Sequence, residues 1–186
     1  MSSPTTRSLR TLLDDVAADR VAPAGGTGAA VTGAMGAALC EMVCLHTDAG
    51  NLRSDLERRR QSLLALADRD AAVVDELFGG GQAAEGPSAD ARLQKRATGV
   101  PLAVAEASLA VLAGADRLLE GGRSGVLADA ETGAYLADAA LRASLATVRI
   151  NLDALADPAF AATVADRADS IEGSAAETRA SVFHNE

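Results

Sequence analysis

The sequence predicts an all-α fold, a single-domain bundle of about six helices around one central helix of small residues. Aromatic residues make up only 2% of the chain and apolar residues 48%, so the core must consist of Ala, Leu and Val. Such a core favours close-packed helices over a sandwich or a barrel. The 186 residues suit one domain, which we place over 1–186 with its core at about 9–162.

The central helix is predicted within residues 25–47, a stretch with almost no polar face. A helix that is apolar all round must be enclosed on every side, by protein or by lipid. Its small residues step by four along two neighbouring faces, at 28, 32, 36 and 40 and at 29, 33 and 37. Each interior glycine costs about 1 kcal/mol relative to alanine. We therefore expect these glycines to allow close approach of a neighbouring helix or a ligand.

A membrane span is the less favoured interpretation of this stretch. Its length is sufficient to cross a bilayer, and small residues four apart also occur between membrane helices. Glu41 and His46 interrupt it, however, and no Trp or Tyr belt flanks it. We therefore expect no membrane partner.

Before the central helix, residues 8–20 are predicted to form an amphipathic helix, followed by a turn over 22–26. Four apolar residues form the stripe of this first helix: Leu9, Leu12, Leu13 and Val16.

The third predicted helix, residues 52–78, places a carboxylate on its inward face. Its inward positions alternate in steps of four and three, and six of the eight are apolar, with Arg59 and Asp70 at the other two. Asp68 and Asp75 point elsewhere. A carboxyl group on an apolar face is costly unless paired, and burial raises its pKa, as general acid–base chemistry near neutral pH requires. The alternative is a structural salt bridge, to Arg59 or to an arginine of another helix.

A glycine-rich break over residues 79–87 precedes the fourth predicted helix. Ser88 is its expected N-cap, and the helix extends to about Glu120. Pro101 removes a backbone donor and kinks this helix. A kink frees backbone carbonyls, so it either marks a nearby site or only bends the helix around the centre.

Two more helices follow. The first begins near Asp129, whose carboxylate can cap backbone donors, and its charged residues Asp138, Arg142, Arg149 and Asp153 are predicted to form a stripe separate from its inward leucines. Asp157 and Pro158 end this helix and start the last one, residues 159–181.

Charge and cysteine content restrict the partners. The net charge of −9 argues against a nucleic-acid partner. The N-terminal charges of Arg10, Asp14 and Asp15 interrupt any secretory signal, so we expect a cytoplasmic protein. Cys40 and Cys44 lie one turn apart without further ligands at zinc spacing, so we expect two small buried side chains and no metal.

Six separated stretches form a pattern in register. They are Pro23–Ala30, Gly33–Val43, Asp68–Ala71, Val100–Glu106, Ala128–Ala130 and Arg149–Leu155. Together they resemble the P-x-G-G-G-S-x-A-A, G-A-L-G-A-A-L, D-x-D-A, V-P-L-x-x-A-E, S-D-A and R-I-N-L-x-x-L segments of the cyclodeaminase/cyclohydrolase family of folate enzymes. Thr27 and Gly28 stand where the family has Gly-Ser, which puts a hydroxyl contact at the turn in question. Ala128 replaces the serine of S-D-A.

The resemblance implies an all-α homodimer that acts on tetrahydrofolate one-carbon units. Members hydrolyse 5,10-methenyltetrahydrofolate to 10-formyltetrahydrofolate, or convert 5-formiminotetrahydrofolate to the methenyl form with release of ammonia. Neither reaction requires a cofactor besides the folate substrate. The departures from the family pattern leave one alternative, a non-catalytic helical scaffold that dimerises through the small-residue helix.

The resemblance also assigns the site. The catalytic aspartate of D-x-D-A falls on Asp70, with Asp68 as the second candidate. The turn would let the pterin ring approach the backbone, Asp129 and Asn151 would hydrogen-bond the pterin or the reacting nitrogens, and the basic residues at 95 and 96 would meet the glutamate tail. The implied substrate-binding residues are Gly25, Gly26, Thr27, Lys95, Asp129 and Asn151.

Overall fold

The computed structural model describes residues 3–47, 49–78, 87–121 and 125–183, and within these ranges it contains helices and no strand. A short 3₁₀ segment, η1 (Pro4–Thr6), comes first. Six α-helices follow: α1 (Leu9–Ala17), α2 (Gly25–Leu45), α3 (Gly50–Phe78), α4 (Pro87–Gly121), α5 (Leu127–Leu152) and α6 (Pro158–Val182). The predicted all-α fold is confirmed.

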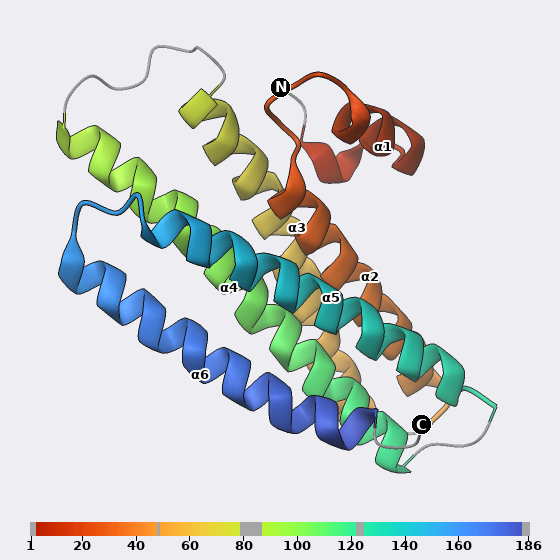
Figure 1. Ribbon diagram of the computed structural model, residues 1–186. Helices are drawn as coiled ribbons and strands as arrows, with labels where there is room; N and C mark the ends of the chain where they lie inside the picture. Colours follow the sequence, from red (N-terminus) through yellow and green to blue (C-terminus); the bar gives the residue numbers. More distant parts are fainter. Residues whose placement is uncertain (1–2, 48, 79–86, 122–124, 184–186) are drawn as a thin grey trace.

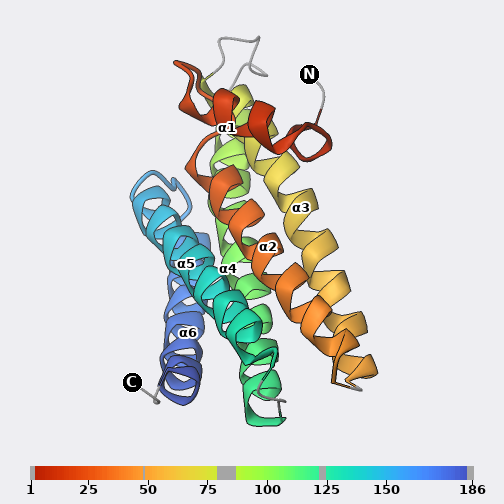
Figure 2. The ribbon, with the colours of Figure 1, turned by 90° about the vertical axis from the view of Figure 1, so that its right-hand side faces the viewer.

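The helices α2, α3, α4 and α5 form the bundle, and α6 lies along α4 and α5 on its outside (Figure 1). The short α1 lies across the end of the bundle where α2 begins and α3 ends (Figure 2). The main core combines α2, α3, α4 and α5, and a second apolar cluster joins α4 and α5 to α6. Both clusters consist chiefly of Ala, Leu and Val, as the composition predicts.

Small residues bring α2 and α5 into backbone contact. A Cβ atom on Gly36 of α2 would lie 2.7 Å from the carbonyl oxygen of Gly133 on α5. A Cβ atom on Gly133 would lie 2.7 Å from the sulfur of Cys40. Since real Cβ atoms do not approach so closely, both positions require glycine. The close approach predicted for the central helix is confirmed.

Within one chain, α2 is not enclosed on every side, in contrast to the expectation for a helix that is apolar all round. Met35 is 49% exposed and Leu45 is 61% exposed, although ten other residues of α2 are buried. One apolar face of the helix therefore lies on the surface of the chain. By length and composition alone, α2 and residues 90–121 of α4 could each cross a membrane, but half of each apolar window is buried inside the protein.

The predicted apolar stripe of α1 mostly faces outward. Leu9 and Leu13 are 60% and 57% exposed, and of the four stripe residues only Leu12 is buried. The inner side instead carries Asp15, which forms ion pairs with Arg7 and Arg20 from the segments on either side of α1. These ion pairs hold the carboxylate of Asp15 on the inner side of α1. The helix α1 ends at Ala17, three residues before the predicted end.

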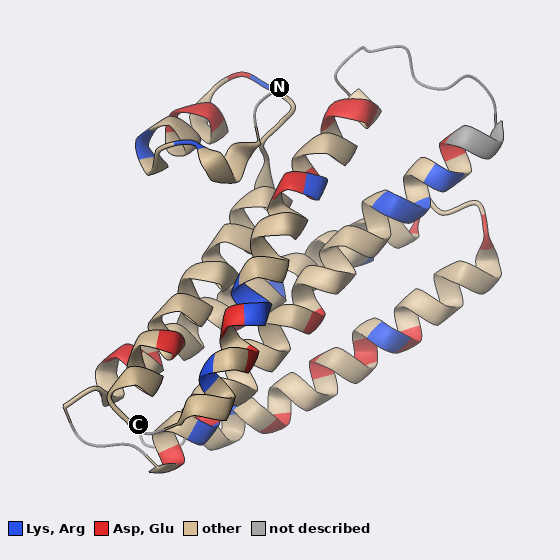
Figure 3. Ribbon diagram, turned by 180° about the vertical axis from the view of Figure 1, so that it is seen from behind, with Lys and Arg blue, Asp and Glu red and all other residues tan. Residues whose placement is uncertain are grey.

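Charged residues connect the other helices at the surface. Arg60 of α3 donates to Glu41 of α2 at 2.6 Å, and Arg179 of α6 donates to Asp138 of α5 at 2.8 Å. Asp138 is only 8% exposed, and its carboxylate also lies 3.8 Å from the guanidinium of Arg142, its neighbour in the predicted charged stripe of α5. Figure 3 shows the molecule from behind, with acidic and basic residues interspersed along the helices, as expected when charges pair between neighbours.

Helix ends follow the sequence signals in part. Asp157 caps α6 by accepting a hydrogen bond from the N–H of Phe160 at 3.1 Å, and Pro158 occupies the first turn, as predicted. Ser88 lies inside α4, which begins at Pro87, rather than capping it. Asp129 lies in the first turn of α5, where no side chain caps the helix. Of the predicted glycine-rich break, residues 79–86 lie outside the described residues.

We expect Gly36→Ala to lower the free energy of unfolding by about 1–3 kcal/mol, because its Cβ would force α2 and α5 apart. The melting temperature should fall by roughly 2–4 °C for each kcal/mol. Gly173→Ala is the matched control, since nothing lies within 4 Å of a Cβ at this exposed site on α6. It should stabilise the protein by up to about 1 kcal/mol. Equal melting temperatures for the two variants would contradict the proposed close contact.

Candidate active site

A cavity of about 390 Å³ opens at the end of the bundle where α2 begins. Its walls come from residues 21–26, the C-terminal part of α3, the part of α4 just before Pro101 and the last two turns of α5. The lining is apolar except for Asp70, Thr147 and Asn151. A mostly apolar cavity with a few convergent polar groups is typical of a small-molecule site.

The carboxyl group of Asp70 is buried at this cavity and is only 7% exposed. The hydroxyl of Thr27 donates a hydrogen bond to Oδ2 of Asp70 at 2.8 Å. Burial raises the pKa of Asp70, and hydrogen bonds from the hydroxyl and backbone of Thr27 act in the opposite direction. The partner of Asp70 is therefore Thr27 and not Arg59, which is exposed. A hydroxyl group at this turn, that of Thr27, therefore contacts the Asp70 carboxyl group.

The first turn of α2 fits directly against this carboxyl group. A Cβ atom on Gly26 would lie 2.6 Å from Cγ of Asp70 and would overlap Oδ1. The absence of a side chain at Gly26 thus lets the backbone of α2 approach the carboxyl group. Gly25 lines the same cavity and has nothing within 4 Å of a Cβ position.

The proline inside α4, Pro101, leads to a second polar contact at the cavity. In a regular helix the carbonyl of Ala97 would accept a hydrogen bond from the N–H of residue 101, but Pro101 has no N–H. Instead the side-chain amide of Asn151, on α5, donates to the carbonyl of Ala97 at 2.9 Å. Both residues line the cavity. The Ala97 carbonyl, which Pro101 leaves without its helical donor, therefore accepts a hydrogen bond from Asn151, a predicted site residue.

The structure brings Gly25, Gly26, Asp70 and Asn151 to one cavity, and Thr27 contacts Asp70 directly. It does not bring Lys95 there. The Lys95 amine lies 2.6 Å from a carboxylate oxygen of Asp157 and 5.0 Å from the ring centre of Phe160, which connects α4 to the start of α6.

Asp129 is distant from the cavity within one chain. It lies 22 residues before Asn151 on α5, which corresponds to about 33 Å along a continuous helix. Substrate-binding roles for Lys95 and Asp129 remain predictions.

Thr147 is a cavity residue that the sequence analysis did not single out. It lies one helical turn before Asn151, so the spacing of two polar residues on one face of α5 could have indicated it. The sequence pattern does not distinguish the apolar residues of the cavity wall from ordinary core residues. These wall residues are Val73, Val74 and Leu77 of α3 and Val100 of α4.

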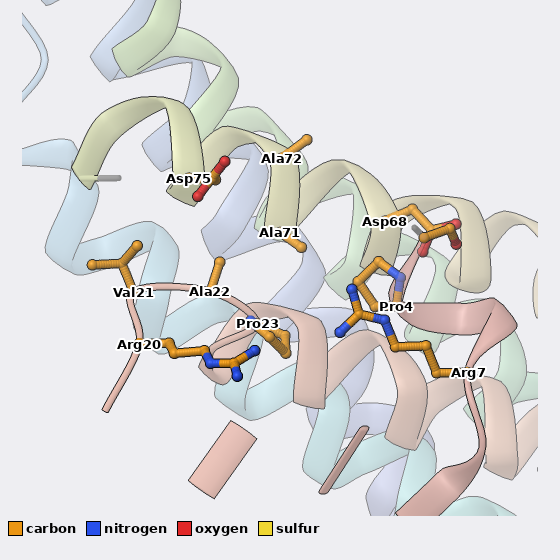
Figure 4. A pocket seen from close by; sticks show the side chains of 11 residues that line it. Pro4, Arg7, Arg20, Val21, Ala22, Pro23, Asp68, Ala71, Ala72 and Asp75 are labelled. Atoms are coloured by element: carbon orange, nitrogen blue, oxygen red, sulfur yellow. The ribbon is translucent and has the colours of Figure 1, made fainter. Parts of the chain in front are cut away.

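A larger cavity, of about 580 Å³, lies beside the first, and Val21 lines both. Figure 4 shows Asp68, Ala71, Ala72 and Asp75 of α3 on one side of it, with Arg20 and Pro23 on the other. Asp68 accepts hydrogen bonds from the N–H and the hydroxyl of Thr5, at 3.2 and 2.9 Å. Asp68 and Asp70 therefore line different cavities. Among the described residues, Asp70 is the one charged residue that lines its cavity, whereas Asp68 shares its cavity with Arg7, Arg20 and Asp75.

Comparisons with known proteins identify the family of this chain. Residues 8–170 match the formiminotransferase-cyclodeaminase family. The protein belongs to that family. A methenyltetrahydrofolate cyclohydrolase from Methylorubrum extorquens is 31% identical over 192 aligned positions, which cover 93% of this chain and 91% of the relative.

The family fold is also seen among solved structures. The crystal structure of a formiminotetrahydrofolate cyclodeaminase from Thermotoga maritima superposes with a TM-score of 0.89 at 23% identity. The match covers 96% of this chain and 94% of the other. The all-α fold of this family member is thus shared with a formiminotetrahydrofolate cyclodeaminase.

We expect Thr27→Val to raise the pKa of Asp70 further, because the variant removes a hydrogen bond that favours the carboxylate. Carbon-13 NMR titration of the Asp70 carboxyl group measures this directly. Thr163→Val is the control, because the Thr163 hydroxyl bonds only to its own helix, at the carbonyl of Ala159. An Asp70 pKa that is unchanged or lower in the Thr27 variant would contradict the assignment.

The same shift has a consequence for stability. A pKa that is raised in the native state means that the native protein binds more protons than the unfolded chain between the two pKa values. The free energy of unfolding should therefore fall as pH rises through that interval, and urea titrations should show that Asp70→Asn removes this fall.

Proposed function

We propose that the protein hydrolyses 5,10-methenyltetrahydrofolate to 10-formyltetrahydrofolate. Conversion of 5-formiminotetrahydrofolate to the methenyl form, with release of ammonia, is the related reaction that the same site would support. The observation that carries the proposal is the buried carboxyl group of Asp70, which lies at an apolar cavity and against the backbone of Gly26. The cyclohydrolase relative supports hydrolysis as the first reaction to test.

The proposed hydrolysis needs one group that accepts and returns a proton. A water oxygen adds to the methenyl carbon between N5 and N10, and Asp70 accepts one water proton. The bond from that carbon to N5 then breaks, its electron pair stays on N5, and the hydroxyl proton passes to N5 as the formyl group forms on N10. Starting from the methenyl cation, the reaction releases one proton to solvent.

The cyclodeaminase reaction would use the same carbon. N10 adds to the formimino carbon and forms a tetrahedral intermediate that carries an amino group. The N10 proton passes to the former imino nitrogen, which becomes that amino group, and one further proton is donated to it. The bond between the carbon and the protonated amino nitrogen then breaks with its electron pair on nitrogen, so that ammonia leaves and the methenyl cation remains. A protonated Asp70 can donate to the leaving nitrogen, and its raised pKa keeps the protonated form accessible closer to neutral pH.

We expect Asp70→Asn to lower kcat by about 100-fold or more, because an amide of the same shape cannot exchange the proton. The decay of methenyltetrahydrofolate absorbance measures hydrolysis, and ammonia release measures the second reaction. Asp68→Asn is the matched control on the same helix, since Asp68 serves the other cavity. It should keep near wild-type activity with both substrates.

Three outcomes would change this interpretation. Loss of activity in the Asp68 variant alone would move the catalytic role to Asp68. Wild-type turnover by the Asp70 variant would end the assignment. A wild-type protein that neither binds nor converts either folate would favour the non-catalytic scaffold.

A homodimer is part of the proposal. An apolar helix is stable when enclosed, yet α2 exposes Met35 on its surface, and Ile150 of α5 is 73% exposed. Ala139 and Ala143, near the middle of α5, are also exposed and small enough to let another helix approach closely. A second copy of the chain would cover this face of α2 and α5.

An antiparallel pairing of two α5 helices about their middle would have a chemical consequence. Asp129 and Asn151 lie at opposite ends of α5, so such a pairing would bring Asp129 of each copy beside the Asn151 end of the other. In that arrangement Asp129 would reach the cavity of the partner rather than its own. This reconciles its predicted role with its distance from Asn151.

We expect inactive Asp70→Asn and Asp129→Asn proteins, when mixed and allowed to exchange subunits, to recover about a quarter of wild-type activity. Half of the dimers would be mixed, and each would hold one intact site. Sedimentation should show wild-type protein at twice the 18.8 kDa chain mass. Met35→Glu should shift it toward monomer, whereas Ala162→Glu, on the exposed face of α6, should not. A monomeric wild type, or no recovery on mixing, would contradict the shared site.

A further inference from the structure

A hydrogen bond at the cavity joins the segment of α4 just before Pro101 to the last turn of α5. α4 and α5 pack along each other (Figure 1), and Pro101 is buried between its neighbours in the bundle. Pro101 leaves the carbonyl of Ala97 without its helical donor, and the amide nitrogen of Asn151 donates to that carbonyl at 2.9 Å. The replacement donor comes from a different helix, so the missing bond in α4 fixes a side chain on α5.

This hydrogen bond determines which way the amide of Asn151 points. A carbonyl oxygen only accepts hydrogen bonds, so the Nδ2 group must face Ala97 and Oδ1 must face away from it. Within the described residues no group donates to Oδ1. Asn151 lines the cavity that holds Asp70. Its Oδ1 is therefore an oriented acceptor that is left for a ligand.

We propose that Pro101 is a positioning residue, which acts through Asn151 to fix an acceptor oxygen for an N–H or O–H group of the bound folate. The proposal rests on the proposed function for the nature of the ligand. A residue with a backbone N–H at position 101 would compete for the Ala97 carbonyl. The Asn151 amide would then rotate or become mobile, and the ligand would lose a preorganised partner.

A purely structural role for Pro101 makes a different prediction. Proline inside a helix is unfavourable, because it removes one hydrogen bond and its ring crowds the preceding turn. If Pro101 acts through Asn151 and not through packing, its replacement by alanine should leave the melting temperature unchanged or raise it. If Pro101 served packing alone, its replacement would instead lower the melting temperature and leave activity per folded molecule unchanged.

The test is a double-mutant cycle on kcat/KM for methenyltetrahydrofolate with Pro101→Ala and Asn151→Ala. We expect Pro101→Ala to lower kcat/KM about tenfold and Asn151→Ala to lower it at least as much. The double variant should lose no more than Asn151→Ala alone, because Pro101 acts only through that side chain. Pro101→Val, which retains more of the buried volume, is the second variant in case the alanine protein folds poorly.

Pro158→Ala is the matched control. Pro158 occupies the first turn of α6, where an added N–H has no helical acceptor, so the variant should keep wild-type kcat/KM. Additive losses in the double variant, or wild-type kcat/KM for both Pro101 variants, would overturn the proposal.

A spectroscopic measurement separates this proposal from the proposed function. The side-chain amide signals of Asn151 should shift, and their hydrogen exchange should accelerate, in Pro101→Ala relative to the wild type and to Pro158→Ala. Unchanged signals would overturn the positioning role even if the enzyme is active. If the wild type converts no folate, the proposed function fails, whereas a shift of the Asn151 signals would still support the effect of Pro101 on its orientation.

Discussion

The contact between the backbone of α2 and the carboxyl group of Asp70 is the constraint on which the site depends. Gly26 has no side chain, so the first turn of α2 can lie directly against Asp70 and shield it from water. Burial alone would raise the carboxyl pKa, and the Thr27 hydroxyl limits that rise. The first turn of α2 thereby affects the position of the Asp70 carboxyl group, its exposure to water and its pKa.

The same helix shows why small residues are used despite their cost. Interior glycines weaken a helix, but Gly36 and Gly133 let α2 and α5 approach until their backbones touch. This contact sets where the far end of α5 lies, and with it Asn151. Tight packing in the middle of the bundle and the geometry of the cavity at its end are therefore coupled through two rigid helices.

Local irregularities of the helices also serve the cavity. Pro101 breaks the hydrogen-bond ladder of α4 beside the site, and the freed carbonyl is satisfied by a side chain that lines the cavity. Lys95, two residues before Ala97, contacts Asp157 at the start of α6, which holds this part of α4 against the outer helix. The polar contacts beside the cavity thus connect α4 with α5 and with the start of α6 at one end of the bundle.

The sequence by itself determined the helical fold and the inward position of Asp70. Both depend on local periodicity, because apolar residues at steps of three and four define one face of a helix whatever surrounds it. Only the tertiary structure decided the partners: Thr27 for Asp70, Ala97 for Asn151 and Asp157 for Lys95. Such pairs join residues from different elements, and the crossing of two helices depends on packing that no single periodic pattern encodes. For the same reason the outward face of α1 and the exposed side of α2 were not predictable, since an apolar stripe does not say what covers it.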